Sequence, residues 1–234
     1  MPVYNESEGI ADFIFEINRF LFKYSPIFLI VDDKSTDLTF HEIQSIRRET
    51  KINILPIKNK ENIGHGPSTI KAITEGLKLA ETIITVDGDG QFYGSDIYKG
   101  LDLFLSSKCD VLEAVRVGRS DPWFRKVMSF SLKYFILLKS GKSSSDANTP
   151  LRFYKSEALE DLLRNIPKNT LIPNLYISVF ARRNSLIIES MNVRSRDRRG
   201  NVTIGSTWGR GNSILPNLRL IKFSLNALRE SLKI

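Results

Sequence analysis

The chain has 234 residues, of which 41% are hydrophobic and 26% are charged. This composition excludes a disordered chain, and the length suits one α/β domain with a sizeable core. The formal net charge of +8 predicts an anionic partner, which is a nucleic acid, a lipid head group or a phosphorylated small molecule. The single cysteine, Cys109, excludes an intramolecular disulfide and favours a reducing compartment.

The first half of the chain predicts alternating strands and helices. Residues 27–31 form a short apolar run, which is typical of a strand buried on both faces, and Pro67 stands where it suits the first turn of a helix. On such signals we expect strands at 27–31, 52–57, 82–86 and 110–115, and helices at 36–49, 67–80 and 95–105. Strict alternation predicts a parallel sheet with right-handed crossovers and flanking helices, so the fold class is α/β.

The pattern changes after Arg116. We expect helices at 123–139, 159–165 and 175–183, strands at 151–154 and 186–193, a Ser-rich loop at 142–150 and a basic loop at 194–211. An amphipathic helix follows from about Leu215. We therefore expect one catalytic domain over residues 1–212, and a C-terminal helix over 213–234 that either belongs to it or contacts a membrane peripherally.

The N-terminus shows no secretory signal, because residues 1–6 have neither a basic region nor an apolar core. Apolar runs such as Tyr134 to Leu138 fall far short of the roughly 18–20 residues that a transmembrane helix needs. We expect a cytoplasmic protein, with any membrane contact peripheral and on the cytoplasmic face.

Paired acids follow two of the expected strands. Asp32 and Asp33 follow the first, while Asp87 and Asp89 follow the third within Asp-Gly-Asp-Gly-Gln. Ligands of open α/β sheets bind outside the carboxyl ends of the strands. Two carboxylates one residue apart, with glycines that allow a tight turn, suit a hard divalent cation that also binds a diphosphate. A solvated Asp-Gly turn is the alternative.

Four segments carry a resemblance to a known family. In chain order they are Pro2-Val3-Tyr4-Asn5-Glu6, Val31-Asp32-Asp33-Lys34-Ser35-Thr36-Asp37, Asn62-Ile63-Gly64-His65-Gly66 and Asp87-Gly88-Asp89-Gly90-Gln91. They resemble the family 2 glycosyltransferases, most of all the dolichyl- or polyprenyl-phosphate branch. The resemblance is close to about residue 155 and loose beyond it. It implies the glycosyltransferase A-type fold, which is Rossmann-like and mainly parallel, a nucleotide-sugar donor, and Mg²⁺ or Mn²⁺ as cofactor.

The resemblance also implies roles for individual residues. The metal ligands would be Asp87, Asp89 and Gln91. Nucleotide-sugar binding would fall to Pro2, Tyr4, Glu6, Asp33, Asp87, Arg152 and Arg196. Asp33 has a second interpretation, as an acid at the N-terminus of the following helix. For the late basic segment around Arg196, the alternatives are a loop that closes over the pyrophosphate and a basic surface loop.

Arginines near the metal motif suggest a phosphorylated acceptor, because a guanidinium binds phosphate oxygens in pairs and keeps its charge. Arg116 and Arg119 are the candidates, and Arg125 is as consistent with a solvated surface. With Asp89 and Asp146 they complete the expected catalytic set. A Glu-Asp pair that many relatives use as a base has no counterpart, since Asn174-Leu175 stands there; a phosphate acceptor needs no base. The chain also starts at the first motif, so we expect part of the first strand to lie upstream.

The leading hypothesis is a metal-dependent inverting glycosyltransferase that moves a hexose from a nucleotide-sugar to a phosphorylated lipid, with an anionic membrane surface as a possible partner. One alternative is a hydroxyl acceptor on a glycan or glycolipid, with Asp146 as base. A basic nucleic-acid-binding protein is the alternative of another class, but the recognition motifs of such proteins are absent, so we expect no nucleic-acid partner. The donor sugar, its base and the oligomeric state stay open.

Overall fold

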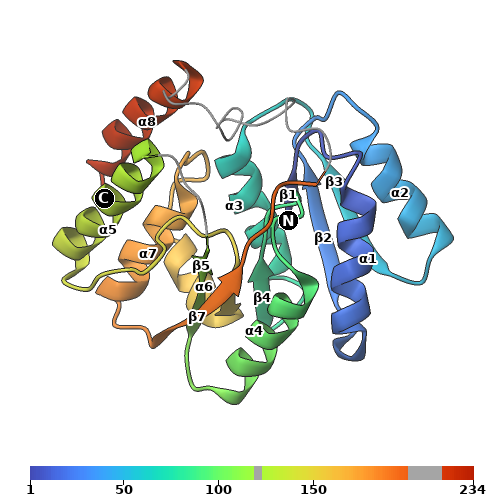
Figure 1. The fold of residues 1–234 in the computed structure, drawn as a ribbon, viewed down its shortest axis with the longest axis horizontal. Helices are drawn as coiled ribbons and strands as arrows, with labels where there is room; N and C mark the ends of the chain where they lie inside the picture. The colour runs from blue at the N-terminus through green and yellow to red at the C-terminus, as the bar shows by residue number, and fades with distance from the viewer. Residues whose placement is uncertain (119–122, 200–217) are drawn as a thin grey trace.

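The structure is a computed structural model that describes residues 1–118, 123–199 and 218–234. Within these ranges the strands are β1 (Pro2–Val3), β2 (Ile27–Asp32), β3 (Asn53–Lys58), β4 (Thr82–Thr85), β5 (Val111–Val117), β6 (Arg152–Lys155) and β7 (Ile188–Arg194). They form two sheets, in the orders β1-β2-β3 and β4-β6-β5-β7. The sheets meet just after β4, where the Gly88 N–H donates a 3.2 Å hydrogen bond to the Pro2 carbonyl of β1 (Figure 1).

Most strand pairs are parallel, so the expected A-type α/β fold is confirmed. β2 pairs in parallel with β1 and β3, and β5 pairs in parallel with β7. The exception is β6, which is antiparallel to both β4 and β5. Its first residue, Arg152, pairs with Glu113, and Tyr154 pairs with Val111 near the start of β5, so β6 runs back along that strand.

The described helices are α1 (Ile10–Leu21), the 3₁₀ turn η1 (Phe22–Tyr24), α2 (Thr39–Glu49), α3 (His65–Gly76), α4 (Gly94–Ser106), α5 (Trp123–Ser140), α6 (Ser156–Leu163), α7 (Pro173–Arg183) and α8 (Leu218–Ser231). Most lie where the sequence predicts them. α1 was not predicted, although its buried residues follow helical spacing: Ile10, Phe13, Ile14, Ile17 and Leu21. α2 begins three residues later than expected, because Asp37 accepts a 2.9 Å hydrogen bond from the Thr39 N–H and so orders the turn before the helix.

Two hydrophobic cores lie on opposite faces of the β4-β6-β5-β7 sheet. Neighbouring strand residues point to opposite faces, so Leu112 and Phe153 pack with α1, α2 and α4, while Val111 and Tyr154 pack with α3, α6 and α7. Buried side chains on both faces are typical of a sheet covered by helices on each side. The strand ends are thereby held rigidly, which positions the loops that follow them.

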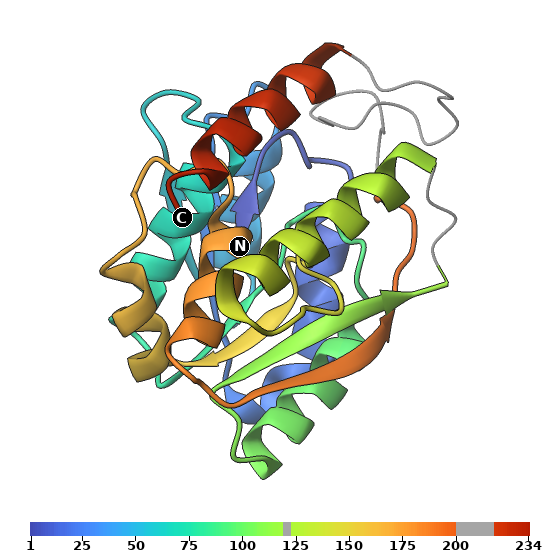
Figure 2. The same ribbon diagram turned by 90° about the vertical axis from the view of Figure 1, so that its left-hand side faces the viewer.

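α5 and α8 form the outer layer beyond α7. α5 packs against α7, where Ile136 contacts the cluster of Leu175 and Val179. α8 lies beside α5 in both views (Figures 1 and 2), and its Ser224 hydroxyl is 4.0 Å from the Met128 sulfur. Among the described residues, no helix is both long and apolar enough to cross a bilayer. The boundary expected at 212/213 lies outside the described residues.

Candidate active site

The acidic loop after β4 lies against the first strand. Besides the hydrogen bond from Gly88 to Pro2, a Cβ atom at Gly88 would overlap the Val3 side chain, so only glycine allows this close approach. The Asp33 N–H donates to the Val3 carbonyl over 2.9 Å on the other side of β1. The first, second and fourth sequence motifs therefore meet at one edge of the sheet, as their positions after parallel strands predict.

Asp87 and Asp89 are close enough for their negative charges to repel each other. Burial, and then the charge of Asp87, raise the pKa of Asp89 to about 6, although the Gln91 N–H donates a 3.1 Å hydrogen bond to its carboxylate. The His65 Nε2 is 3.6 Å from an Asp87 oxygen. A cation between the carboxylates would remove their repulsion, so the donor set fits Mg²⁺ or Mn²⁺.

The donor set is also sparse. The described residues contain no group of three or more His, Cys, Asp or Glu side chains that could hold a metal ion together. Mg²⁺ is usually bound by one or two carboxylates plus substrate phosphates. A cation at Asp87 and Asp89 would therefore complete its coordination with oxygens from a bound diphosphate.

The Asp33 carboxylate is hydrogen-bonded to other residues of the protein. Its carboxylate is buried and accepts hydrogen bonds from the Ile63 N–H (2.9 Å), the Gly64 N–H (2.8 Å) and the Asn59 amide (2.9 Å). It thus holds the Gly-His-Gly loop that begins α3. In this structure its contacts are those of a loop anchor, and the expected contact with a base or ribose stays a prediction.

Glu6 faces the same edge of the sheet and is paired with a residue that the sequence did not single out. The Arg198 guanidinium donates two hydrogen bonds to the Glu6 carboxylate, one of them over 3.0 Å from Nε. Burial raises the pKa of Glu6 to about 8, the charges of Asp89 and Asp87 add to this, and Arg198 opposes it. Because these partners are 192 residues apart in sequence, no local pattern could have paired them.

Arg198 belongs to a basic segment that we name the arginine strap, residues 194–199. It continues β7 and forms a bridge between Ser195 and Phe92, directly after the acidic loop. The Arg196 guanidinium donates to the carbonyls of Gly90 (2.7 Å) and Phe92 (2.9 Å). The expected contact between Arg196 and the donor is therefore replaced, in this structure, by contacts with the loop that carries Asp89.

The structure brings Arg116 and Asp146 together. Arg116 Nε and Nη2 donate to the two Asp146 carboxylate oxygens over 2.8 and 2.9 Å, and both side chains are largely buried. Two residues predicted as catalytic thus form one ion pair at the carboxyl end of β5. Arg119 lies outside the described residues, as does the Arg125 side chain.

Arg152 is a correction. The sequence assigns it to nucleotide-sugar binding, but its side chain is 0% exposed and donates to the carbonyls of Thr149, Ala147 and Asn174. It is 3.5 Å from Glu113, which also accepts two hydrogen bonds from Arg182. A buried guanidinium with these partners cannot reach a ligand, so Arg152 stabilises the core beneath the site.

Tyr4 is partly exposed just after β1, and Pro2 in that strand is buried. Their expected contacts with the nucleotide stay predictions.

The fold and the site define a class of protein. An α/β sheet with one acidic loop suited to a cation and a diphosphate, and a second acidic strand end beside it, is the architecture of a nucleotide-dependent transferase of the A-type fold. The chain belongs to glycosyl transferase family 2, whose model matches residues 1–163. It is a nucleotide-sugar glycosyltransferase of that family.

Solved structures agree with this fold. The glucosyl-3-phosphoglycerate synthase from Mycobacterium tuberculosis with phosphoglyceric acid has a TM-score of 0.69 at 16% identity, over 99% of this chain and 77% of that one. With Mn²⁺ and UDP-glucose it has a TM-score of 0.63 at 14% identity, over 100% and 77%. The mannosyltransferase PcManGT from Pyrobaculum calidifontis, with GDP-Man and Mn²⁺, has a TM-score of 0.63 at 15% identity, over 100% and 63%. These similarities extend beyond the polyprenyl-phosphate branch, so membership in that branch stays a proposal.

Proposed function

We propose that this enzyme is a metal-dependent, inverting hexosyltransferase whose donor is a nucleoside-diphosphate sugar and whose acceptor is a phosphorylated lipid. The donor is supported by the similar structures that hold Mn²⁺ with UDP-glucose or GDP-Man. Asp87 and Asp89 would hold the cation, with Gln91 beside them, and Pro2, Tyr4 and Glu6 would line the nucleotide pocket. When bound, the cation would neutralise negative charge on the leaving diphosphate.

The acceptor side requires charge rather than a base. The acceptor oxygen forms a bond to the anomeric carbon while the bond from that carbon to the diphosphate breaks, and the electron pair leaves with the nucleoside diphosphate. A phosphate oxygen is already anionic and has no proton to lose. Arg116 lies at the end of β5 in its ion pair with Asp146, and Arg119 is proposed to add positive charge there. A hydroxyl acceptor would need Asp146 as base, and in this structure both oxygens of that carboxylate accept hydrogen bonds from Arg116.

The observation that carries the lipid part is the exposed surface of α5 and α8. Each helix presents an apolar stripe at helical spacing: Trp123, Val127, Phe130, Tyr134, Leu137 and Leu138 on α5, and Leu218, Ile221, Leu225 and Leu228 on α8, with Leu232 just after that helix. α5 contains four Lys or Arg residues and no acid. It follows β5, which carries Arg116, along the chain.

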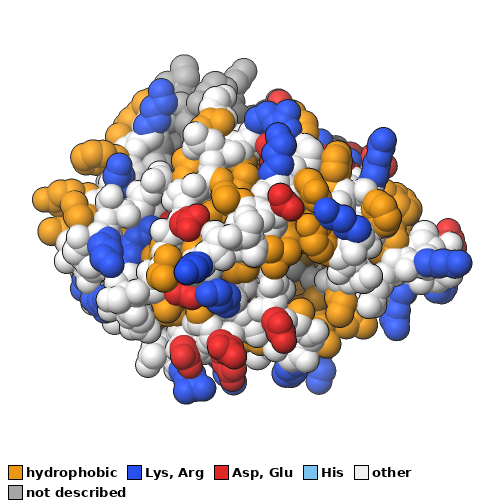
Figure 3. Space-filling model, turned by 90° about the horizontal axis from the view of Figure 1, so that it is seen from below, with side chains coloured by type: hydrophobic (Ala, Val, Ile, Leu, Met, Phe, Trp, Pro, Cys, Tyr) orange, Lys and Arg blue, Asp and Glu red, His pale blue; other side chains and the backbone are white. Residues whose placement is uncertain are grey.

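This surface differs from the face seen from below, where acidic and basic side chains are interspersed (Figure 3). α8 adds the exposed cations Lys222 and Arg229, and its one acid, Glu230, accepts hydrogen bonds from Thr170 and Leu171. A helix pair with apolar side chains and excess positive charge is complementary to an anionic bilayer. An acceptor with a lipid tail must be met at such a surface.

The test is a transfer assay with labelled UDP-glucose and GDP-mannose, each with Mn²⁺. The acceptors are a polyprenyl phosphate in anionic vesicles, 3-phosphoglycerate in solution, and a neutral glycolipid. We expect label in the polyprenyl phosphate fraction and none when EDTA replaces Mn²⁺. Transfer to 3-phosphoglycerate alone, or to the glycolipid alone, would overturn the lipid-phosphate acceptor and keep the donor assignment.

A further inference from the structure

We name the acidic loop after β4, residues 87–92, the metal loop. Four of its consecutive carbonyls accept hydrogen bonds from the arginine strap. The Arg199 N–H donates to Asp89 and the Arg196 N–H to Gln91, each over 3.0 Å. The Arg196 guanidinium donates to Gly90 and Phe92. The backbone of Asp89 to Phe92 is therefore held from the strap, so the position of the strap determines where the Asp89 carboxylate lies.

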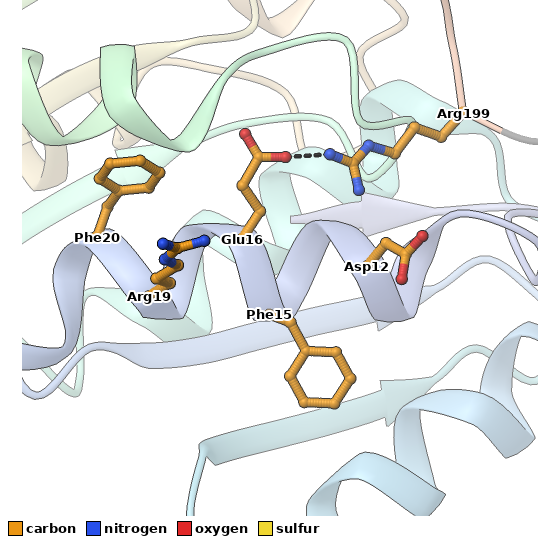
Figure 4. A pocket seen from close by; sticks show the side chains of 6 residues that line it. All are labelled: Asp12, Phe15, Glu16, Arg19, Phe20 and Arg199. Atoms are coloured by element: carbon orange, nitrogen blue, oxygen red, sulfur yellow. Dashed lines mark hydrogen bonds and ion pairs between the residues drawn. The ribbon is translucent and has the colours of Figure 1, made fainter.

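The strap is in turn fixed by one side chain of α1. Glu16 accepts a 2.7 Å hydrogen bond from Arg196 Nη2 and a second one from Arg199 Nη2, of which Figure 4 shows the second. Its other oxygen accepts a 2.7 Å hydrogen bond from the Gly94 N–H, at the start of α4. Burial opposes ionisation of Glu16, but the hydrogen bonds from Arg196 and Gly94 and the charges of both arginines hold its pKa below its ordinary value.

Glycines around this contact allow the chain segments to approach closely. A Cβ atom at Gly94 would be 2.9 Å from the Glu16 carbonyl oxygen. The stem of Arg199 lies against two further glycines, because a Cβ atom would be 2.6 Å from it at Gly9 and 2.8 Å from it at Gly90. Arg199 thus packs closely against the start of α1 and the metal loop, which makes the strap an integral part of the site.

From this chain of contacts we infer that Glu16 is a positioning residue for the metal site, acting through Arg196 and Arg199 on the loop that carries Asp89. The inference rests on the proposed metal-dependent function. Glu16 touches neither donor nor cation in this scheme; it fixes the strap, and the strap fixes the loop. Residues that orient metal ligands from behind commonly change metal affinity by about 10–100-fold when replaced.

The experiment compares Glu16→Gln with Asp12→Asn. Both remove one negative charge from α1, and both side chains line the same open cavity of about 450 Å³, together with Phe15, Arg19, Phe20 and Arg199 (Figure 4). Glu16→Gln has the shape of the parent side chain but lacks the charge that holds two arginines. Asp12→Asn leaves the hydrogen bonds of Glu16 with Arg196 and Arg199 in place, so it serves as the matched control.

Mn²⁺ binding is measured by the loss of the free-ion EPR signal, with the nucleoside diphosphate present. We expect Glu16→Gln to weaken the Mn²⁺ affinity at least tenfold and Asp12→Asn to leave the Mn²⁺ affinity unchanged. In metal-free protein, amide hydrogen exchange should accelerate at Arg196 and Arg199 only in Glu16→Gln. Excess Mn²⁺ should restore kcat, which a general folding defect would not allow.

Equal Mn²⁺ affinity in Glu16→Gln and the parent overturns the inference. Faster exchange at Arg196 and Arg199 with unchanged Mn²⁺ affinity does so too, since the strap would then be loosened without effect on the metal. If the parent itself binds no Mn²⁺ with any nucleoside diphosphate, the proposed function fails. That outcome is read from the parent alone and is distinct from a difference between the variants.

Discussion

The residues of the site differ in how far a local sequence pattern can reveal them. The position of Asp87 and Asp89 directly after a strand could be predicted from the local pattern, while their role as metal ligands stays a prediction. Glu16 could not be predicted, since its partners Arg196 and Arg199 lie some 180 residues away. Arg152 shows the opposite error. The family resemblance implied a ligand contact, while the structure buries its side chain next to Glu113.

Replacement of Asp89 by Asn should abolish metal-dependent donor binding and leave the fold intact. An amide is a poorer ligand for a hard cation than a carboxylate. Burial and the charge of Asp87 raise the pKa of Asp89 to about 6, so its charged form is disfavoured in the metal-free protein. Asp89→Asn should therefore be as stable as the metal-free parent, or more stable by on the order of 1–2 kcal/mol.

The measurement is thermal melting with UDP-glucose, with and without Mn²⁺. Saturation at 100 times Kd adds about 2.7 kcal/mol to the parent and should add nothing to the variant. A control is Asp12→Asn, an acid lost elsewhere on the surface. If Asp89→Asn and the parent show the same Mn²⁺-dependent shift, this loop is not the metal site.

At the scale of elements, strands and helices with strong periodicity could be predicted closely. Residues 27–31 were expected as a strand and β2 spans Ile27–Asp32. The direction of β6 could not be predicted, because a four-residue strand carries no sign of its polarity and its antiparallel pairing depends on the path of the chain through α5. α1 shows a missed signal, since its apolar spacing was present in the sequence.

Glu113 on β5 is the buried counter-charge of two arginines at the β4-β6-β5-β7 sheet. It lies between buried Arg152 and Arg182, and the Ser144 hydroxyl donates to it over 3.2 Å. Glu113→Gln keeps the size of the side chain but leaves two buried cations without their counter-charge. Loss of one partner from a buried ion pair costs about 3–5 kcal/mol, and we expect that loss in the free energy of unfolding.

The effect should depend on pH in a defined direction. Burial raises the pKa of Glu113, but the charge of Arg152, the hydrogen bond from Arg182 and that residue's charge outweigh it, so the pKa lies below the ordinary 4.5. A lowered carboxyl pKa contributes stability above the ordinary pKa and loses it as the pH falls through the lowered value. The deficit of Glu113→Gln in urea unfolding should thus be full at pH 7 and shrink below about pH 4. Glu157→Gln, at an exposed position on α6, should stay within about 0.5 kcal/mol of the parent at both pH values.

At the scale of the whole molecule, the cations behind the net charge of +8 include two groups in different surroundings. Each arginine of the strap forms an ion pair: Arg198 with Glu6, Arg196 and Arg199 with Glu16, and Arg194, whose side chain is 59% exposed, with Asp96. The cations of α5 and α8 instead surround exposed apolar stripes. The total charge could be read from composition. Which cations form ion pairs, as in the strap, and which lie beside exposed apolar side chains, as on α5 and α8, could not be read from composition. That depends on which acids the fold places near each arginine.

The proposed membrane contact predicts salt-sensitive binding to anionic vesicles through the α5 stripe. Phe130 is 71% exposed and Leu138 69% exposed, so their replacement by Ser should not disturb the core. Burial of a Phe or Leu side chain is worth about 1.5–3 kcal/mol, so Phe130→Ser/Leu138→Ser should weaken vesicle binding by at least tenfold. Phe22 and Leu38, which are 70% and 63% exposed, lie far from α5 in sequence and outside both stripes.

Co-sedimentation with vesicles of anionic phospholipid, at low and at high salt, measures this binding. The parent and the control Phe22→Ser/Leu38→Ser should pellet together at low salt, and both should be released as salt screens the cations of α5 and α8. Phe130→Ser/Leu138→Ser should stay in the supernatant and lose transfer to vesicle-bound polyprenyl phosphate, while its Mn²⁺-dependent binding of the donor is unchanged. Equal loss in the two double variants would mean that apolar exposure in general, and not the α5 stripe, drives the binding. A parent that stays wholly in the supernatant would leave a soluble phosphorylated acceptor as the better assignment, because the proposed role of Arg116 suits either acceptor while only the lipid needs the stripe.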